Sequence, residues 1–263
     1  MNQIENLSEP KEIGMADEWF QFVSPEHFWM QWRHAGVLRA IKAADVPLQH
    51  ALEIGCGNGV ARNMLERDLN VPVDGCDLSR AGLEMAQPAR GRLLFYNILD
   101  LEPSMLGRYD AVFLLDVIEH IPDDRAFLAA ALKHLRPGGV LVVNVPASMM
   151  LFSQYDRVTG HVRRYTRGSL GQLLRECGVT PEGLHHWGLS MVPVVLARKF
   201  YLRIIPPADT MRVGFSPPNR AVRTVFGALK KIETFLPFAM PFGSSLLAWG
   251  RRPANRKRAA VTA

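Results

Sequence analysis

The chain is poor in cysteine and has no long apolar run. Its three cysteines, Cys56, Cys76 and Cys177, form neither a CxxC pair nor a Cys/His pattern with metal-ligand spacing. This argues against a disulfide framework and a zinc site, and it fits a reducing cytoplasm. The longest apolar runs, such as MVPVVLA, are far shorter than the roughly 20 residues that cross a bilayer. The acidic first residues lack the apolar core of a signal peptide, so we expect a cytoplasmic protein that is soluble or lies on a surface.

Excess positive charge is also absent from most of the chain. The formal net charge is +6, but residues 251–263 carry five positive charges and no acid, so residues 1–250 sum to only +1. We expect the end of the chain to be a flexible basic tail, with binding to polyanions or anionic lipid as the alternative. RNA-binding proteins usually show a broad basic face or a recognisable extra domain. Nucleic acid is therefore not an expected partner.

What the chain does contain is a regular alternation of apolar runs and helical patterns. Hydrophobic residues make up 48% of the composition and charged residues 21%, which is typical of a globular protein with a substantial core. Buried strands are predicted within residues 50–59, 71–79, 91–100, 109–121 and 140–147, and helices over residues 59–67, 80–88 and 123–139. This order predicts a doubly wound α/β fold. Its parallel sheet would be covered on both faces and would bind a ligand at the carboxyl ends of the strands.

A glycine-rich turn follows the first of these strands. Residues 53–59, EIGCGNG, place glycines at alternate positions, and Glu53 lies two residues before the first of them. A dinucleotide fingerprint would require a third glycine where the chain has Val60, which disfavours NAD. An acid at the strand end suits a cation better than a pyrophosphate. Asp77, 22 residues after Gly55, ends the second strand, where its carboxylate can accept hydrogen bonds from both hydroxyls of a ribose.

Five motifs together resemble one family. LEIGCGNG, GCDLS, NILDL, YDAVFLLDVIEHI and LRPGGVLVVNVPA occur in this order over about residues 50–147, and they are similar to the motifs of class I S-adenosylmethionine-dependent methyltransferases. The resemblance implies a doubly wound, seven-stranded Rossmann-like sheet with helices on both faces and an antiparallel last strand. It also implies that the chain binds S-adenosylmethionine and releases S-adenosylhomocysteine.

The same resemblance implies which residues contact this cofactor. The glycine turn would lie against the methionine portion, Glu53 would face its ammonium directly or through water, and Asp77 would hold the ribose. Asn97 matches the position that meets the adenine amino group, with Asp100 as the alternative. Asp116 would border the methionine end and the acceptor. The full predicted set is Glu53, Gly55, Cys56, Gly57, Asn58, Gly59, Asp77, Leu78, Asn97, Ile98, Asp116 and Val117.

An acidic motif after the fourth strand raises the question of a metal. Asp116, Glu119 and His120 have the spacing D-x-x-E-H, which brings three potential ligands onto one turn. The chain resembles ubiquinone-type O-methyltransferases here, and some relatives hold a divalent metal with such a triad. Alternatively, Glu119 and His120 form hydrogen bonds with the loop and thereby position Asp116. Magnesium sites usually need more carboxylates or substrate oxygens than this stretch offers, so we predict no metal.

A basic stretch, TGHVRRYTRGSL at residues 159–170, follows the fifth predicted strand. It leads into a helix for which Thr166 or Ser169 is the predicted N-cap, so the loop should lie at the carboxyl edge of the sheet. A subgroup of bacterial small-molecule methyltransferases is similar here and has a GHxRRY element. His161 is the first candidate for a general base and His120 the second.

Further side chains near this loop are candidates for contacts with the acceptor. We predict that Tyr165 orients the reacting groups and that Arg164 or Arg163 clamps a carboxylate or phosphate of the acceptor. Alternatively, His161 only bonds loop backbone, and the arginines pair with Asp156 or nearby acids.

An upstream HFW element at residues 27–29 is also similar to the subgroup and is followed by Arg33. Phe22, Trp29 and Trp32 either wall off water at the cofactor mouth or pack into the core. The predicted substrate-binding residues are Trp29, Arg33, Tyr155 and Arg163.

A long basic and apolar insert precedes the predicted last strand. Residues 189–242 contain eight lysines and arginines but only two acids, and NRAVRTVFGALKKIETFL has a helical apolar stripe. Residues 212–236 either lie in the interface of an anionic membrane or cover a hydrophobic acceptor. Alternatively, the insert packs on the sheet or on a second subunit. The predicted organisation is an N-terminal helical cap (1–46), a Rossmann-like core (47–188), a helical lid (189–242), the last strand (243–252) and the tail (253–263).

These features predict an S-adenosylmethionine-dependent methyltransferase that acts on a small, hydrophobic or lipid-like acceptor. O-methylation is favoured over N- or C-methylation because histidines suited to deprotonation are present. The rival functions are a non-catalytic cofactor-binding or scaffold protein and an RNA methyltransferase.

Overall fold

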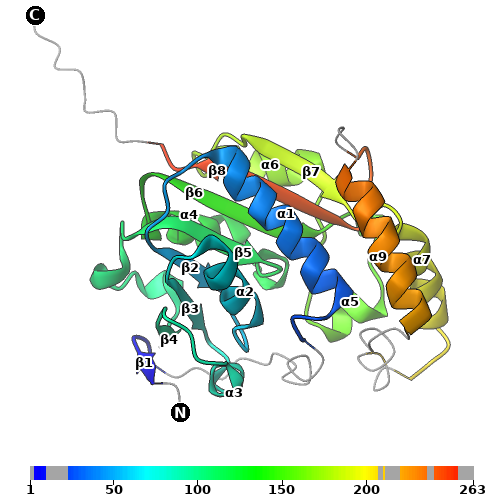
Figure 1. Cartoon of the computed structure of the whole chain (residues 1–263), viewed down its shortest axis with the longest axis horizontal. Helices are drawn as coiled ribbons and strands as arrows, with labels where there is room; N and C mark the ends of the chain where they lie inside the picture. Colours follow the sequence, from blue (N-terminus) through cyan, green and yellow to red (C-terminus); the bar gives the residue numbers. More distant parts are fainter. Residues whose placement is uncertain (1–2, 10–22, 207–209, 211–219, 236–239, 254–263) are drawn as a thin grey trace, which may run out of the picture.

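The fold is built on one eight-stranded sheet. The computed structural model describes residues 3–9, 23–206, 210, 220–235 and 240–253. The strand order is β1-β4-β3-β2-β5-β6-β8-β7 (Figure 1). The strands are β1 (Ile4–Asn6), β2 (Ala51–Ile54), β3 (Val73–Asp77), β4 (Leu93–Phe95), β5 (Tyr109–Leu115), β6 (Leu135–Pro146), β7 (Gly183–Trp187) and β8 (Ser245–Arg251). Only β8 runs antiparallel to its neighbours, β6 and β7, which confirms the predicted doubly wound sheet with an antiparallel last strand.

Helices cover both faces of this sheet. They are α1 (Phe28–Ala44), α2 (Val60–Leu69), α3 (Arg80–Met85), α4 (Asp124–His134), α5 (Gln154–Val158), α6 (Arg167–Glu176), α7 (Val192–Tyr201) and α9 (Arg220–Phe235). Alternate residues of β5 point to opposite faces: Val112 and Leu114 pack with α4 and α6, whereas Ala111 and Phe113 pack with α1 and α2. A strand buried on both faces is mostly apolar, which is why β5 reads as a continuous hydrophobic run from Ala111 to Leu115.

Two details differ from the sequence prediction. β1 adds an eighth strand to the edge of β4 within the segment expected to be a helical cap. A strand of three residues is too short to show an alternation of apolar and polar side chains. β1 therefore depends on pairing with the edge of β4 and not on a pattern of its own. α4 ends at His134, and the Pro and Gly residues expected to close it lie at the start of β6. The proline ring disfavours helical geometry in the residue before it.

The described part of the insert includes α7 and α9, which lie beside the sheet (Figure 1). α9 contacts α1, where the rings of Phe226 and Phe28 stack with centroids 4.7 Å apart. Glu233 of α9 accepts hydrogen bonds from the backbone N–H groups of Gly188 and Ser190, at 3.0 and 2.7 Å, just before α7. Within the described residues, no helix is long and apolar enough to span a bilayer. Residues 212–219 and 236 of the predicted membrane-contact segment lie outside the described residues.

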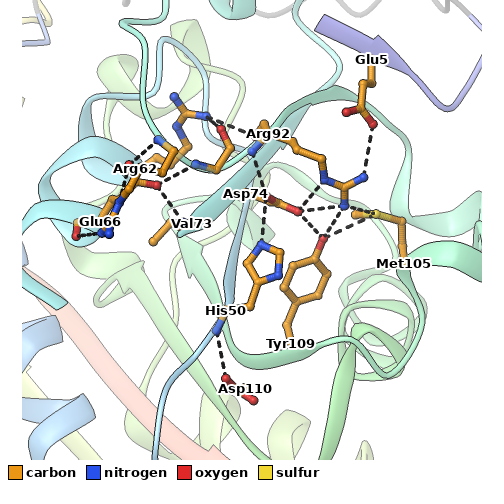
Figure 2. A network of polar contacts seen from close by, with 12 residues as sticks. Glu5, His50, Arg62, Glu66, Val73, Asp74, Arg92, Met105, Tyr109 and Asp110 are labelled. Carbon is orange, nitrogen blue, oxygen red and sulfur yellow. Dashed lines mark hydrogen bonds and ion pairs between the residues drawn. The ribbon is translucent and has the colours of Figure 1, made fainter. Parts of the chain in front are cut away.

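A buried ionic network closes the edge of the sheet that holds the amino ends of the strands. Asp74, 1% exposed, accepts hydrogen bonds from Arg92 (2.8 Å) and from the Tyr109 hydroxyl (2.8 Å) and lies 3.1 Å from His50 (Figure 2). Burial alone would raise the pKa of Asp74, but hydrogen bonds from Arg92 and Tyr109 lower it below its ordinary value. These residues begin or precede β2, β3, β4 and β5, so the network holds the sheet together at the edge away from the predicted ligand site.

Replacing Tyr109 with phenylalanine should therefore destabilise the fold without affecting ligand binding. We expect the free energy of unfolding to fall by about 1.5–3 kcal/mol, since a hydrogen bond to a buried charged group is lost. Tyr96→Phe is a matched control, because among the described residues the Tyr96 hydroxyl bonds the His134 ring and the Glu102 N–H, both at 2.9 Å, and no charged group. Two neutral partners should cost about 1 kcal/mol. Denaturant titration measures both losses, and equal losses would contradict the charged-network interpretation.

Candidate active site

The glycine turn after β2 adopts a backbone that suits glycine. Gly55, Gly57 and Gly59 have φ values of 76°, 52° and 72°. A Cβ on Gly55 would lie 2.6 Å from Cγ2 of Val117, so the turn packs directly against the loop that follows β5. Other residues at these positions would be strained, because a Cβ disfavours positive φ. The predicted contacts Gly55 and Val117 thus come together at the carboxyl edge of the sheet.

Asp77 ties two of the loops at this edge to each other. Its Oδ2 accepts from the Gly57 N–H at 2.7 Å, and its Oδ1 accepts from the Ser79 N–H at 2.8 Å. A carboxylate only accepts hydrogen bonds, so Asp77 is chemically suited to bind ligand hydroxyls. Leu78 and Asn58 are half-buried beside it. Cys56 is buried, and burial raises the pKa of its thiol well above the ordinary value, so it acts as an apolar wall.

Glu53 is the clearest sign that this site takes a cation. It is 2% exposed, and among the described residues its Oε2 atom has no hydrogen-bond partner. Burial raises the pKa of Glu53 to about 8, although the charges of Arg33 and Arg62 partly offset this. A buried carboxyl group left in this state is costly unless a ligand satisfies it. The unpartnered Oε2 of Glu53 and the glycine turn together fit the aminoacyl end of S-adenosylmethionine.

Asp116 follows β5 beside the glycine turn, and its side chain is fixed in part by a residue of α1. Its backbone is left-handed, with φ 62°, a strained conformation for a residue with a side chain. Asn144 donates to its Oδ1 at 2.8 Å and Arg33 of α1 to its Oδ2 at 2.6 Å. The Arg33 guanidinium also lies 4.8 Å from the ring centroid of Trp29. The prediction that Trp29 and Arg33 reach the site from α1 therefore has a structural basis, and their contact with the acceptor stays a prediction.

The other predicted aromatics behave differently. Trp32 is 2% exposed and packs with Trp187, as the core-packing alternative expected. Phe22 lies outside the described residues. Tyr155 is buried beneath the Arg198 guanidinium, which lies 4.2 Å from the ring centroid, and burial raises its pKa to about 12.

The candidates for adenine recognition share one turn after β4. Asn97 Oδ1 accepts from the Leu99 N–H at 3.1 Å, and Asn97 Nδ2 lies 3.3 Å from Asp100. Ile98 is buried beneath them. Ser8, which sequence reasoning missed, joins both residues: its hydroxyl accepts from the Asn97 N–H and donates to Asp100. The turn thus presents both candidates, and the choice between them stays a prediction.

His161 is paired with a buried carboxylate. Its Nδ1 lies 2.9 Å from Oδ1 of Asp156, which is fully buried. Arg164 binds the same carboxylate through both oxygens, at 2.7 and 3.1 Å. Burial alone would raise the pKa of Asp156, but hydrogen bonds from His161 and Arg164 hold it well below its ordinary value. An ionised carboxylate only accepts hydrogen bonds, so Nδ1 carries a hydrogen, and in the neutral ring Nε2 is then the nitrogen with the lone pair.

The second candidate base lies against the first. The rings of His120 and His161 meet edge to face with centroids 4.7 Å apart. Burial, helped by the neighbouring His161, lowers the pKa of His120 to about 4, so His120 is neutral at neutral pH. Glu119 is fully buried, and burial together with the charge of Asp116 raises its pKa well above the ordinary value.

Glu119 also bears on the question of a metal. In the part of the chain that the structure describes, neither of its carboxyl oxygens has a hydrogen-bond partner, so its side chain does not fasten the loop as the alternative expected. Glu119, His120 and His161 each offer one ligand atom, and these atoms lie within 4.8 Å of one another. This trio could hold a divalent ion, and it includes His161 in place of Asp116. Our prediction of no metal stays a prediction.

Arg163 and Arg164 of the basic stretch are both engaged by acids, as one alternative expected. Arg164 pairs with Asp156, while Arg163 contacts Asp124 at 2.5 Å. The Tyr165 hydroxyl donates to the same Asp124 at 2.7 Å. Thr166 caps α6, and its N–H in turn bonds Ser169, so both predicted cap residues form one capping box. These contacts fasten the loop, and the predicted acceptor contacts of Arg163, Arg164 and Tyr165 stay predictions.

Comparison with known proteins identifies similar sequences and folds. Residues 19–182 match the model of a methyltransferase domain. The ubiquinone biosynthesis O-methyltransferase of Neisseria meningitidis is 26% identical over 179 residues, which is 64% of this chain and 68% of that protein. The enzyme of the same name from Xanthomonas oryzae is 30% identical over 165 residues, or 58% of this chain and 61% of that one. The N-methyltransferase NodS from Bradyrhizobium japonicum has a similar fold, with TM-score 0.55, 18% identity and coverage of 91% of this chain and 94% of its own.

Proposed function

We propose that this chain, which belongs to the methyltransferase domain family and is a class I S-adenosylmethionine-dependent methyltransferase, methylates a small, hydrophobic acceptor at oxygen. S-adenosylmethionine supplies an activated methyl group on a sulfonium and leaves as S-adenosylhomocysteine. The observation that carries the proposal is the His161–Asp156 pair, with its 2.9 Å contact, in which Asp156 lies in α5 and His161 on the loop that follows α5.

The chain's own residues would hold the cofactor along the carboxyl ends of β2 to β5. Asp77 would accept from the ribose hydroxyls while it keeps the glycine turn in place. Glu53 would face the ammonium with its orphaned oxygen, directly or through water. Asn97 or Asp100 would meet the adenine amino group. Because these groups are fixed by backbone hydrogen bonds and packing, they would align the methyl group with little reorganisation.

The histidine pair supports oxygen as the methylated atom. A hydroxyl is a weak nucleophile until its proton is removed, whereas a neutral amine needs no base. Asp156 fixes the tautomer of His161, so Nε2 would accept the acceptor proton and the resulting imidazolium would be stabilised by the carboxylate. His120 would limit the motion of the His161 ring. The curated relatives named above are O-methyltransferases, which supports the same choice.

The surroundings of this loop support an apolar acceptor. Met149 and Met150, directly after β6, are 53% and 57% exposed, and the Sδ of Met149 lies 3.2 Å from the Arg164 N–H. Thioether side chains adapt to apolar ligands of varied shape. A cytoplasmic location, a homodimer and the contact of residues 212–236 with an anionic membrane stay predictions.

The decisive experiment supplies S-adenosylmethionine with matched apolar acceptors that carry a hydroxyl, an amine or a methyl ether. We expect S-adenosylhomocysteine and an O-methylated product, identified by mass spectrometry, from the hydroxyl compounds only. Cofactor binding without turnover on any acceptor would favour the scaffold function. Salt-sensitive RNA affinity that survives deletion of residues 251–263 would favour an RNA methyltransferase. Faster turnover of the amines would contradict O-methylation.

A further inference from the structure

α7 exposes an apolar face that no described part of the chain covers. Its outward residues fall at helical spacing: Val194 is 41% exposed, Phe200 59%, Tyr201 50%, and Ile204 just beyond the helix 79%. The inward residue Val192 is buried. A surface helix normally turns polar residues outward, so apolar residues on both faces indicate a second apolar neighbour.

Two methionines extend this face toward the catalytic loop. Met149 and Met150 are exposed, and Lys199 of α7 donates to the Met150 carbonyl at 2.6 Å. On its other side α7 carries Arg198 over the ring of Tyr155, the neighbour of Asp156. The α7 patch, defined as Met149, Met150, Val194, Phe200, Tyr201 and Ile204, therefore borders the proposed active site. Figure 1 shows α7 and α9 at the end of the molecule away from β1.

The α7 segment supplies cations to the surroundings of the patch. Residues 191–206 contain no acid, and Lys199 and Arg203 accompany the patch, whereas Arg198 lies on the buried side of α7 over Tyr155. The Arg203 guanidinium lies 5.1 Å from the ring centroid of Phe200, so this cation stands beside exposed apolar surface. Apolar side chains flanked by cations, with a tyrosine among them, are the composition that binds at the headgroup boundary of an anionic bilayer.

A second copy of the chain suits this patch less well. A twofold-symmetric dimer brings the same patch of both copies together, so Lys199 and Arg203 would face their own counterparts with no acid from residues 191–206 between them. An anionic bilayer offers apolar depth and negative charge at once. We propose that the α7 patch docks on an anionic membrane surface and places the mouth of the active site at the lipid boundary. Docking of the patch on the membrane does not depend on the proposed function. The delivery of an acceptor from the membrane to the active site does.

Vesicle flotation tests the docking directly. The full chain is mixed with vesicles of phosphatidylcholine alone or of phosphatidylcholine with phosphatidylglycerol, at low and high salt. We expect binding to the anionic vesicles, weakened by salt. The double variant F200E/I204E should lower the partition coefficient at least about 100-fold, because two apolar side chains lose burial and two added charges are repelled. Leu106→Glu is the matched control, since Leu106 is 38% exposed and precedes β5 at the opposite edge of the sheet.

The other outcomes are equally informative. Absence of flotation with anionic vesicles, or equal loss in Leu106→Glu, would overturn the proposal. Loss in Ile232→Glu alone would assign docking to α9, where Ile232 is 58% exposed, and would also overturn it. A dimer that F200E/I204E dissociates, without vesicle binding, would show that a second copy covers the patch. Turnover of a water-soluble acceptor without vesicles should be the same in F200E/I204E as in the unmodified chain. If the unmodified chain shows no such turnover, the proposed function is refuted, while the docking result still stands.

Discussion

Replacing His161 with alanine is expected to lower kcat for a hydroxyl acceptor by about 10²–10⁴-fold, the usual contribution of a positioned general base. The affinity for S-adenosylmethionine should change little, because the predicted cofactor contacts lie on the loops after β2 to β5. His161 lies on the loop after α5, oriented by Asp156 at 2.9 Å. The effect should therefore appear in kcat and not in cofactor binding.

Two comparisons separate catalysis from a structural role. In the pH–rate profile, the limb that requires a deprotonated base should disappear in His161→Ala, and added imidazole should restore part of the rate. His120→Ala is the matched control, since His120 is 4.7 Å away by ring centroid, and we expect a smaller loss. Full activity in His161→Ala at saturating acceptor, or a larger loss in His120→Ala, would show that His161 is not the base.

Asp156 should contribute both to catalysis, by orienting His161, and to the stability of the fold. In Asp156→Asn the carboxylate can no longer fix the tautomer, so kcat should fall, and Arg164 loses its partner at 2.7 Å. Breaking a buried ion pair costs about 3–5 kcal/mol. Because the pKa of Asp156 is depressed in the folded state, its stabilisation is present above the pKa of an unfolded aspartate and is lost as pH falls through the lower folded value. Asp156→Asn should therefore flatten this part of the acid-unfolding curve.

Local pattern was enough to predict most of the fold. The short apolar run at residues 140–147 follows Pro and Gly residues and is rich in valine, which predicts a buried strand. Thr166 lies three residues before Ser169 at the start of an apolar helical stripe, which predicts the helix cap. The glycine turn was also readable, because alternate glycines followed by a helix imply close approach of backbone or ligand. In each case the information lies within about ten residues of sequence.

The pairings that shape the site could not be predicted in this way. Arg33 meets Asp116 across 83 positions, and Ser8 meets Asp100 across 92. His161 and Asp156 are only five positions apart, but their contact depends on how the chain turns after α5. A side chain's partner is decided by the path of the loops, and composition or periodicity does not encode that path. For the same reason the buried, unpartnered carboxyl of Glu119 became visible only in three dimensions.

Cofactor binding is expected to strengthen with pH through Glu53. Its pKa is raised to about 8, so most of the free protein carries a protonated Glu53 at pH 6. A cationic ligand prefers the carboxylate form, so binding must release a proton. The affinity for S-adenosylmethionine should then rise about tenfold from pH 6 to pH 7 and about fivefold from pH 7 to pH 8, which is about 50-fold overall.

Glu53→Gln should abolish this slope and leave a weaker affinity that is nearly constant over the same pH range. Asp77→Asn is the matched comparison: loss of charge-assisted hydrogen bonds to the ribose should weaken binding by about 10–100-fold at every pH, with the slope retained. Calorimetry in buffers of different ionisation enthalpy counts the protons released by each variant. A slope that persists in Glu53→Gln would mean that another group releases the proton. The orphaned oxygen of Glu53 would then not be the ammonium contact, even if Asp77→Asn behaved as expected.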